Sequence, residues 1–106
     1  VELNNRGVLA ARTGNLEASV QMLIEAAERG GNLQFLVNAS KAIFTLMDRN
    51  GWNPEMAQRG IRYLQMAQTK DMLNPKVISA RELYNQVARK YGVEVVPISG
   101  ARGSGE

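Results

Sequence analysis

Residues 16–27, with the sequence Leu16-Glu17-Ala18-Ser19-Val20-Gln21-Met22-Leu23-Ile24-Glu25-Ala26-Ala27, decide the fold class of this chain. Apolar side chains recur there at steps of three and four, at Leu16, Val20, Leu23, Ile24 and Ala27. That spacing places them on one face of an α-helix, whereas a half-buried strand would alternate with a period of two. The stretch therefore predicts an amphipathic helix that packs against other helices.

Helix-breaking residues lie on both sides of this stretch and recur along the chain. Gly14-Asn15 precedes it and Gly30-Gly31-Asn32 follows it. Further along, Asn53-Pro54 and Asn74-Pro75 each place an N-cap residue before a Pro at the first helical position, where the missing N–H costs nothing. These signals predict an all-α fold with helices at about residues 2–13, 16–29, 33–49, 54–69 and 75–91.

Short loops make neighbouring helices antiparallel, so the first four helices pair into two hairpins. In the first hairpin, small and large residues stand at a spacing found in helical repeats: Leu3, Gly7, Gly14, Ser19, Leu23 and Ala26. Gly7 and Ser19 are expected to face each other, because small side chains let two helices approach closely. This order of residues resembles the tetratricopeptide repeat, although Arg6 and Ala10 stand where that family has Leu and an aromatic residue.

The second hairpin matches the repeat mainly in its second helix, where Gly60, Leu64 and Ala67 keep the steps of Ser19, Leu23 and Ala26. An insertion around 50–54 lengthens this hairpin, and we expect Trp52 to pack against it. The resemblance implies a short solenoid of antiparallel hairpins, with about two repeats and helix 75–91 as a C-terminal cap. The repeat domain is then residues 1–92, followed by an extended or disordered tail over 93–106.

The opening Leu3-Asn4-Asn5-Arg6-Gly7 and the Asn-Gly-Trp-Asn-Pro insertion support a narrower resemblance. Together they resemble the tetratricopeptide domain that follows the receiver domain in some bacterial two-component response regulators. That resemblance implies a cytoplasmic signal-transduction protein whose output is contact with another protein. It also implies that this chain, which begins with Val1, is a piece of a longer protein with the receiver domain upstream.

The composition leaves few side chains for catalysis. The chain has neither His nor Cys, which excludes imidazole general bases, thiol nucleophiles, disulfides and Cys/His metal sites. The adjacent pair Ser40-Lys41 would point about 100° apart on a helix and cannot form a dyad. The glycines of 100–105 lack the Gly-Lys-Ser/Thr ending of a phosphate-binding loop. We therefore expect no enzymatic activity, no cofactor and no metal ion.

The net charge of +3 comes entirely from the second half of the chain, but its cations are scattered rather than clustered. A scattered distribution favours a solvated surface over a nucleic-acid interface. No stretch approaches the ~20 consecutive apolar residues of a membrane span. The expected partner is therefore another protein, with neither a membrane nor a nucleic acid favoured.

A repeat array of this kind offers a concave groove lined by the first helix of each hairpin. The residues expected to bind a partner there are Asn4, Val8, Arg12, Gln34, Asn38, Lys41, Phe44, Thr45 and Arg81. Their amides suit the backbone of a peptide or helix segment, and their cations favour an acidic segment or a terminal carboxylate. Two alternatives stay open: a homodimer formed through helix 75–91 or Val93 to Ile98, and nucleic-acid binding through Arg59, Arg62, Lys70, Lys76, Arg89 and Lys90.

Overall fold

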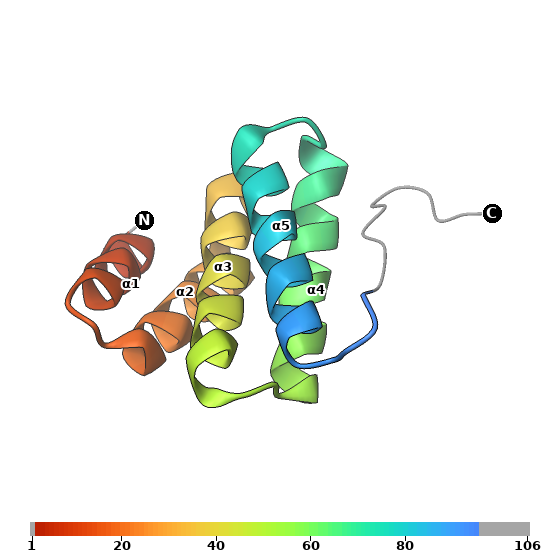
Figure 1. Ribbon diagram of the computed structural model, residues 1–106. Coiled ribbons are helices and arrows are strands. Elements are labelled where there is room, and N and C mark those ends of the chain that lie inside the picture. The colour runs from red at the N-terminus through yellow and green to blue at the C-terminus, as the bar shows by residue number, and fades with distance from the viewer. Residues whose placement is uncertain (1, 96–106) are drawn as a thin grey trace.

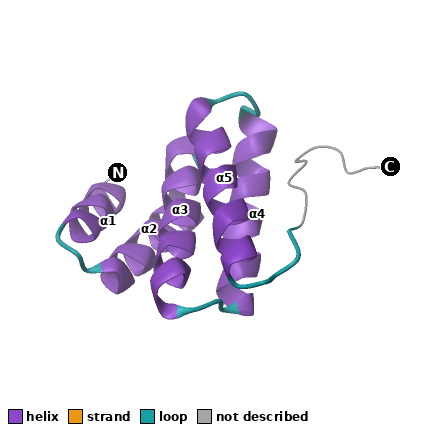
Figure 2. Cartoon of the chain, in the orientation of Figure 1, coloured by secondary structure: helices purple, strands orange, loops and turns teal. Residues whose placement is uncertain are grey.

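The computed structural model describes residues 2–95 of the chain. These residues form five α-helices joined by short turns, without a strand among them (Figures 1 and 2). The helices are α1 (Glu2–Arg12), α2 (Leu16–Gly30), α3 (Leu33–Asn50), α4 (Pro54–Lys70) and α5 (Pro75–Lys90). Each begins and ends within one residue of the bounds expected from the sequence, so the prediction of an all-α fold is confirmed.

Asparagine side chains define where four of the helices begin. The Oδ1 atom of Asn32 accepts the backbone N–H of Phe35 at 2.9 Å, and that of Asn74 accepts the N–H of Lys76 at 2.9 Å. Asn15 and Asn53 cap α2 and α4 in the same way. Each cap satisfies an N–H group that the first helical turn leaves without a partner. This local chemistry explains why the helix bounds can be read directly from the sequence.

The helices form two layers, with α1, α3 and α5 in front of α2 and α4 in the view of Figure 1. The central helix is α3, which packs on α2, α4 and α5 and touches α1 only lightly. Its Leu36, Ile43 and Phe44 side chains are fully buried. The radius of gyration is 13.0 Å, close to the ~13 Å of a compact domain of about 100 residues. The packing is that of a compact helical bundle.

Three aromatic rings join the second hairpin to α5. The ring of Phe44 lies 5.1 Å from that of Tyr84 and 6.2 Å from that of Trp52, measured between centroids. Trp52 is half-buried and packs against the core, as expected for the insertion around 50–54. Because aromatic rings bury large apolar areas, this group fixes α5 on the bundle.

Helix α5 rests more on α3 than on α4, and its end is tied to the end of α3. Lys90 Nζ donates to the backbone oxygen and to Oδ1 of Asp48, at 2.9 and 3.0 Å, and the Tyr91 hydroxyl donates to the same backbone oxygen at 2.8 Å. Beyond α5, the partly buried Val93 and Val95 pack against the core. The remainder of the tail expected over 93–106 lies outside the described residues. Among residues 2–95, no helix combines the length and the apolar character needed to span a bilayer.

Two glycines allow close helix contacts within the hairpins. A Cβ atom on Gly7 would lie 2.6 Å from Leu23 Cγ, and one on Gly60 would lie 2.8 Å from the Phe44 ring. The atoms nearest to this Cβ position on Gly7 belong to Leu23 and Met22, about one turn of α2 beyond the Ser19 that was expected to face it. The larger Leu23 side chain fills the space because Gly7 has no Cβ.

Candidate partner-binding groove

A groove of about 310 Å³ runs between α1 and α3, with α2 as its floor. We call it the α1–α3 groove. It is lined by Val8, Ala11 and Arg12 of α1, by Leu16, Ser19 and Leu23 of α2, and by Asn38, Lys41, Ala42 and Thr45 of α3. It exists because α1 and α3 both pack closely on α2 but hardly on each other.

One hydrogen bond crosses from α1 to α3 beside the groove. Asn38 Nδ2 donates to Asn4 Oδ1 at 3.0 Å. Asn4 is 4% exposed, so its amide is shielded from water and satisfied by Asn38. Because the crossing contacts are few, this bond is a main determinant of the spacing between the two helices.

The charge of the groove is entirely positive. Arg12 is exposed, Lys41 is half-exposed, and no Asp or Glu is among the lining residues. Within residues 2–95, neither cation forms an ion pair: the pairs found there are Arg29 with Glu25, Arg62 with Glu28, and Lys90 with Asp48. The two unpaired cations therefore face an incoming ligand from opposite walls.

The floor combines apolar side chains with one buried hydroxyl. Leu16 and Leu23 are almost fully buried, and Ser19 between them is fully buried. The Ser19 Oγ atom has no hydrogen-bond partner in the described part of the chain. Ser40, a small residue of α3, is equally buried, but its hydroxyl donates to the backbone oxygen of Gly60 at 3.1 Å. An unsatisfied buried hydroxyl is uncommon and costly in a folded protein.

The structure brings together part of the residue set expected from the sequence. Val8, Arg12, Asn38, Lys41 and Thr45 all line the α1–α3 groove. Asn4 adjoins it, but its side chain is buried in the bond to Asn38.

Three further residues of that set lie elsewhere. Phe44 is wrong as a groove residue, because it is fully buried between Trp52 and Tyr84. Gln34 lines a different hollow of about 580 Å³, between the first turns of α3 and α5. Arg81 points toward α4, where its Nη1 donates to Gln68 Oε1 at 3.3 Å. The groove is therefore formed by the first three helices without α5.

The sequence pattern missed the contribution of α2. The pattern indicated ordinary core positions for Leu16 and Leu23. It indicated for Ser19 only a small residue required for close packing. Their spacing of three and four does place them on one face of α2. That pattern could not reveal that α1 and α3 separate enough to leave this face in a groove.

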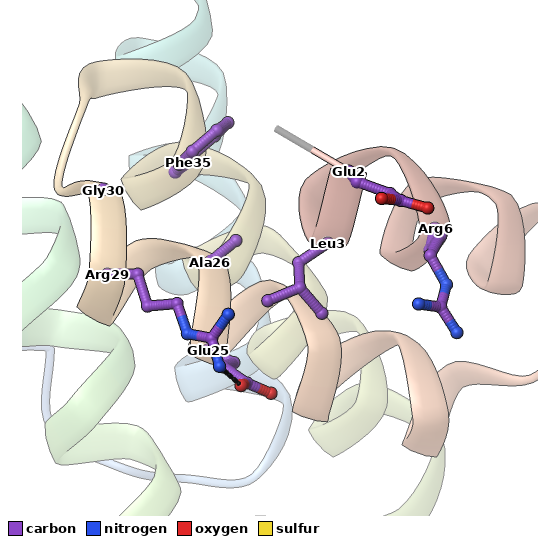
Figure 3. A pocket seen from close by; sticks show the side chains of 8 residues that line it. All are labelled: Glu2, Leu3, Arg6, Glu25, Ala26, Arg29, Gly30 and Phe35. Carbon is purple, nitrogen blue, oxygen red and sulfur yellow. Dashed lines mark ion pairs between the residues drawn. The ribbon is translucent and has the colours of Figure 1, made fainter.

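A further hollow, of about 490 Å³, lies at the start of α1 and the end of α2 (Figure 3). Its apolar lining comes from Leu3, Ala26 and Phe35. Its two arginines, Arg6 and Arg29, are matched there by Glu2 and Glu25, and Arg29 Nη2 contacts Glu25 Oε2 at 2.5 Å. Since its charges balance, this hollow selects a ligand charge less strongly than the α1–α3 groove does.

The remaining polar contacts tie helices together. The Tyr63 hydroxyl of α4 donates to Glu28 Oε2 of α2 at 2.5 Å. Burial of the ring, and next this hydrogen bond, raise the pKa of Tyr63 above its ordinary value of 10.0. Across the described residues, no group of three acidic, His or Cys side chains could hold a metal ion. Comparisons with protein-family models, curated proteins and solved structures found no match to this chain.

Proposed function

We propose that this chain is a protein-interaction module that binds a segment of another protein in the α1–α3 groove. The observation that carries this proposal is the placement of two unpaired cations, Arg12 and Lys41, on facing helices above an apolar floor. Apolar contacts supply affinity in such a groove, while the cations supply selectivity for acidic segments. No catalytic role is proposed for the lining residues.

A tetratricopeptide-like architecture is part of the proposal. It is supported by the two antiparallel hairpins and by the placement of α1, α3 and α5 in one layer (Figure 1). It is also supported by the separation of 34 residues between the bonded Asn4 and Asn38, which equals the ~34-residue period of that repeat. The packing of α5 departs from a regular array. Of the two helices that precede each of them, α3 packs mainly on α2, whereas α5 packs more on α3 than on α4. Helix α5 acts in this view as a cap.

A module of this kind would serve as the output or scaffold part of a larger cytoplasmic regulator, such as a bacterial response regulator. The support for that context is the resemblance of Leu3-Asn4-Asn5-Arg6-Gly7 and of the insertion at Trp52 to the tetratricopeptide domains of such proteins.

Self-association is a second candidate, favoured by one observation. Met72 and Leu73, in the turn between α4 and α5, are 53% and 77% exposed. Exposed apolar residues that lie together can mark a contact with another chain. The turn is a better candidate for a homodimer contact than the apolar stripe of α5, whose Val77, Ala80, Tyr84 and Val87 are buried in the chain itself. A concentration-dependent mass by light scattering that disappears in Leu73→Asp would support it.

Nucleic-acid binding receives less support. Two of the cations considered for it, Arg62 and Lys90, already contact carboxylates of this chain, at 3.8 and 3.0 Å. Binding to DNA or RNA that falls steeply with salt would favour this alternative.

The experiment for the proposed function is selection of peptides from a random library displayed on phage. We expect enrichment of peptides rich in Asp and Glu that no longer bind the R12E/K41E variant. The matched control is R49E/R89E, which changes the net charge equally at exposed arginines outside the groove. Failure to enrich any peptide, or equal binding of enriched peptides to R12E/K41E, would contradict the proposal.

A further inference from the structure

We infer that the α1–α3 groove contains a seat for one carboxylate side chain of the partner, with Ser19 Oγ as its buried donor and Arg12 and Lys41 as its cations. This inference rests on the proposed function, because it specifies the chemistry of the bound segment. It also adds Ser19 of α2 to the binding residues of the two facing helices.

Packing does not explain the hydroxyl group of Ser19. The position requires a small side chain because Ser19 is fully buried on the floor between α1 and α3. Alanine would meet that requirement without burying a polar atom. The hydroxyl of Ser19 instead lies in the protein with no partner among residues 2–95 and lowers the stability of the unliganded fold.

Ser19 differs from Ser40, the other buried serine of these helices, in its hydrogen bonding. Both serines are fully buried small residues in the first three helices. The Ser40 hydroxyl has a structural role, since it donates to the backbone oxygen of Gly60 in α4 at 3.1 Å. Ser19 has no such role within the chain but lines the groove. The unused hydrogen-bonding capacity of the Ser19 hydroxyl therefore points to a partner group outside this chain.

The charged side chains that line the groove with Ser19 are both basic. The lining contains Arg12 and Lys41 and no acidic residue, so the groove favours an anionic group. A carboxylate accepts several hydrogen bonds at once, from a hydroxyl, a guanidinium and an ammonium group. Leu16 and Leu23 flank Ser19 on the floor, so apolar contacts continue on both sides of the seat. That arrangement suits a side chain within a passing segment rather than the end of a chain.

Access to Ser19 requires the groove to widen slightly, because its Oγ atom is covered in the unliganded protein. The packing permits this movement, since α1 contacts α3 lightly and is held mainly by α2. The hydrogen bond between Asn4 and Asn38 is the contact that such a movement would stretch. We expect the ligand to compensate for it by satisfying Ser19.

The test uses pools of octapeptides that are N-acetylated and C-amidated, each with Glu or Asp at one fixed position, and matched pools with Gln or Asn there. Affinities for fluorescently labelled pools are compared by anisotropy. We expect wild type to prefer the carboxylate pools, and Ser19→Ala to lower this preference roughly tenfold, the amount expected for a lost hydrogen bond to a charged group. Ser40→Ala, with its partner in α4, should keep the preference of the wild type.

The outcomes separate this inference from the proposed function. If peptide binding depends on Arg12 and Lys41 while Ser19→Ala keeps the full preference for carboxylate pools, the result contradicts the carboxylate site at Ser19. The same result would support peptide binding in the α1–α3 groove. If no pool binds, both fail. A third set of pools carries a free C-terminal carboxylate and no acidic side chain. If these pools bind more tightly than the acidic ones and depend on Ser19, the assignment to a side chain is overturned.

Discussion

The Asn38 side chain of α3 donates a hydrogen bond to the Asn4 side chain of α1 at 3.0 Å, across a separation of 34 residues. Asn4 is buried, so its amide oxygen has exchanged water for this partner. The two helices otherwise contact each other little. This polar pair therefore has a structural effect larger than that of an ordinary surface hydrogen bond.

The first prediction concerns that pair. Asn38→Ala should lower the free energy of unfolding by about 1 to 3 kcal/mol, because it leaves the Asn4 amide buried without its partner. Asn4→Ala should cost a similar amount, and the double variant should cost less than the sum of the two. Urea unfolding of the four proteins measures this coupling. Asn5→Ala, an exposed neighbour, is the control, and strictly additive losses would contradict a direct interaction.

The second prediction concerns the contact of α3 with α4. Gly60→Ala should destabilise the fold although Ala is the better helix former by about 1 kcal/mol. The new Cβ would lie 2.8 Å from the Phe44 ring, which cannot move away because Trp52 and Tyr84 pack against it. Overpacking typically costs about 1 to 3 kcal/mol. This cost should outweigh the gain in helix propensity, so we expect a net loss of stability. Thermal unfolding beside Gln65→Ala, an exposed site on α4, measures it, and a stabilised Gly60→Ala variant would refute the close contact.

The third prediction concerns the two buried serines. Ser19→Ala should leave stability unchanged or raise it by about 1 kcal/mol, because it removes a polar atom without a partner. Ser40→Ala should lower stability by about 1 kcal/mol, because it removes the bond to Gly60. Chemical denaturation of both variants gives the comparison. A large loss of stability in Ser19→Ala would show that its hydroxyl is satisfied within the fold.

The helix bounds were predictable from the sequence because their causes are local. An Asn cap acts on the N–H groups two or three residues later, and Pro54 and Pro75 fix the first turn of their own helices. Such signals need no knowledge of the tertiary packing. The groove residues were predicted correctly on α1, for Val8 and Arg12, but only in part on α3.

The central helix α3 shows why the rest was not predictable. It packs on helices along several of its faces, so its apolar residues do not form a single stripe from which rotation can be read. Lys41 and Phe44 are three residues apart and looked like neighbours on one face. The structure places Lys41 in the groove and Phe44 in the core on the α5 side. The positions of the Arg81 and Ser19 side chains likewise depend on the rotation of each helix relative to its neighbours, which is set by the tertiary packing.

The fourth prediction concerns stability in alkali. The hydrogen bond to Asp48 raises the pKa of Lys90 above its ordinary value of 10.5, and burial raises the pKa of Tyr63 above 10.0. In both cases the folded protein holds the proton more tightly than the unfolded chain. The contribution of these groups to the stability of the fold is therefore fully present below about pH 10. It is lost as the pH rises through their pKa values in the folded protein.

Urea unfolding at about pH 8 and about pH 11.5 should show this loss. The difference in stability between wild type and Lys90→Met should shrink at the higher pH, because deprotonated Lys90 no longer carries the charge that Asp48 binds. Tyr63→Phe should lose less stability than wild type between the two pH values, because it lacks the ionising hydroxyl. If both variants followed the wild-type pH dependence throughout, the contacts of Lys90 with Asp48 and of Tyr63 with Glu28 would not be the source of the alkaline transition.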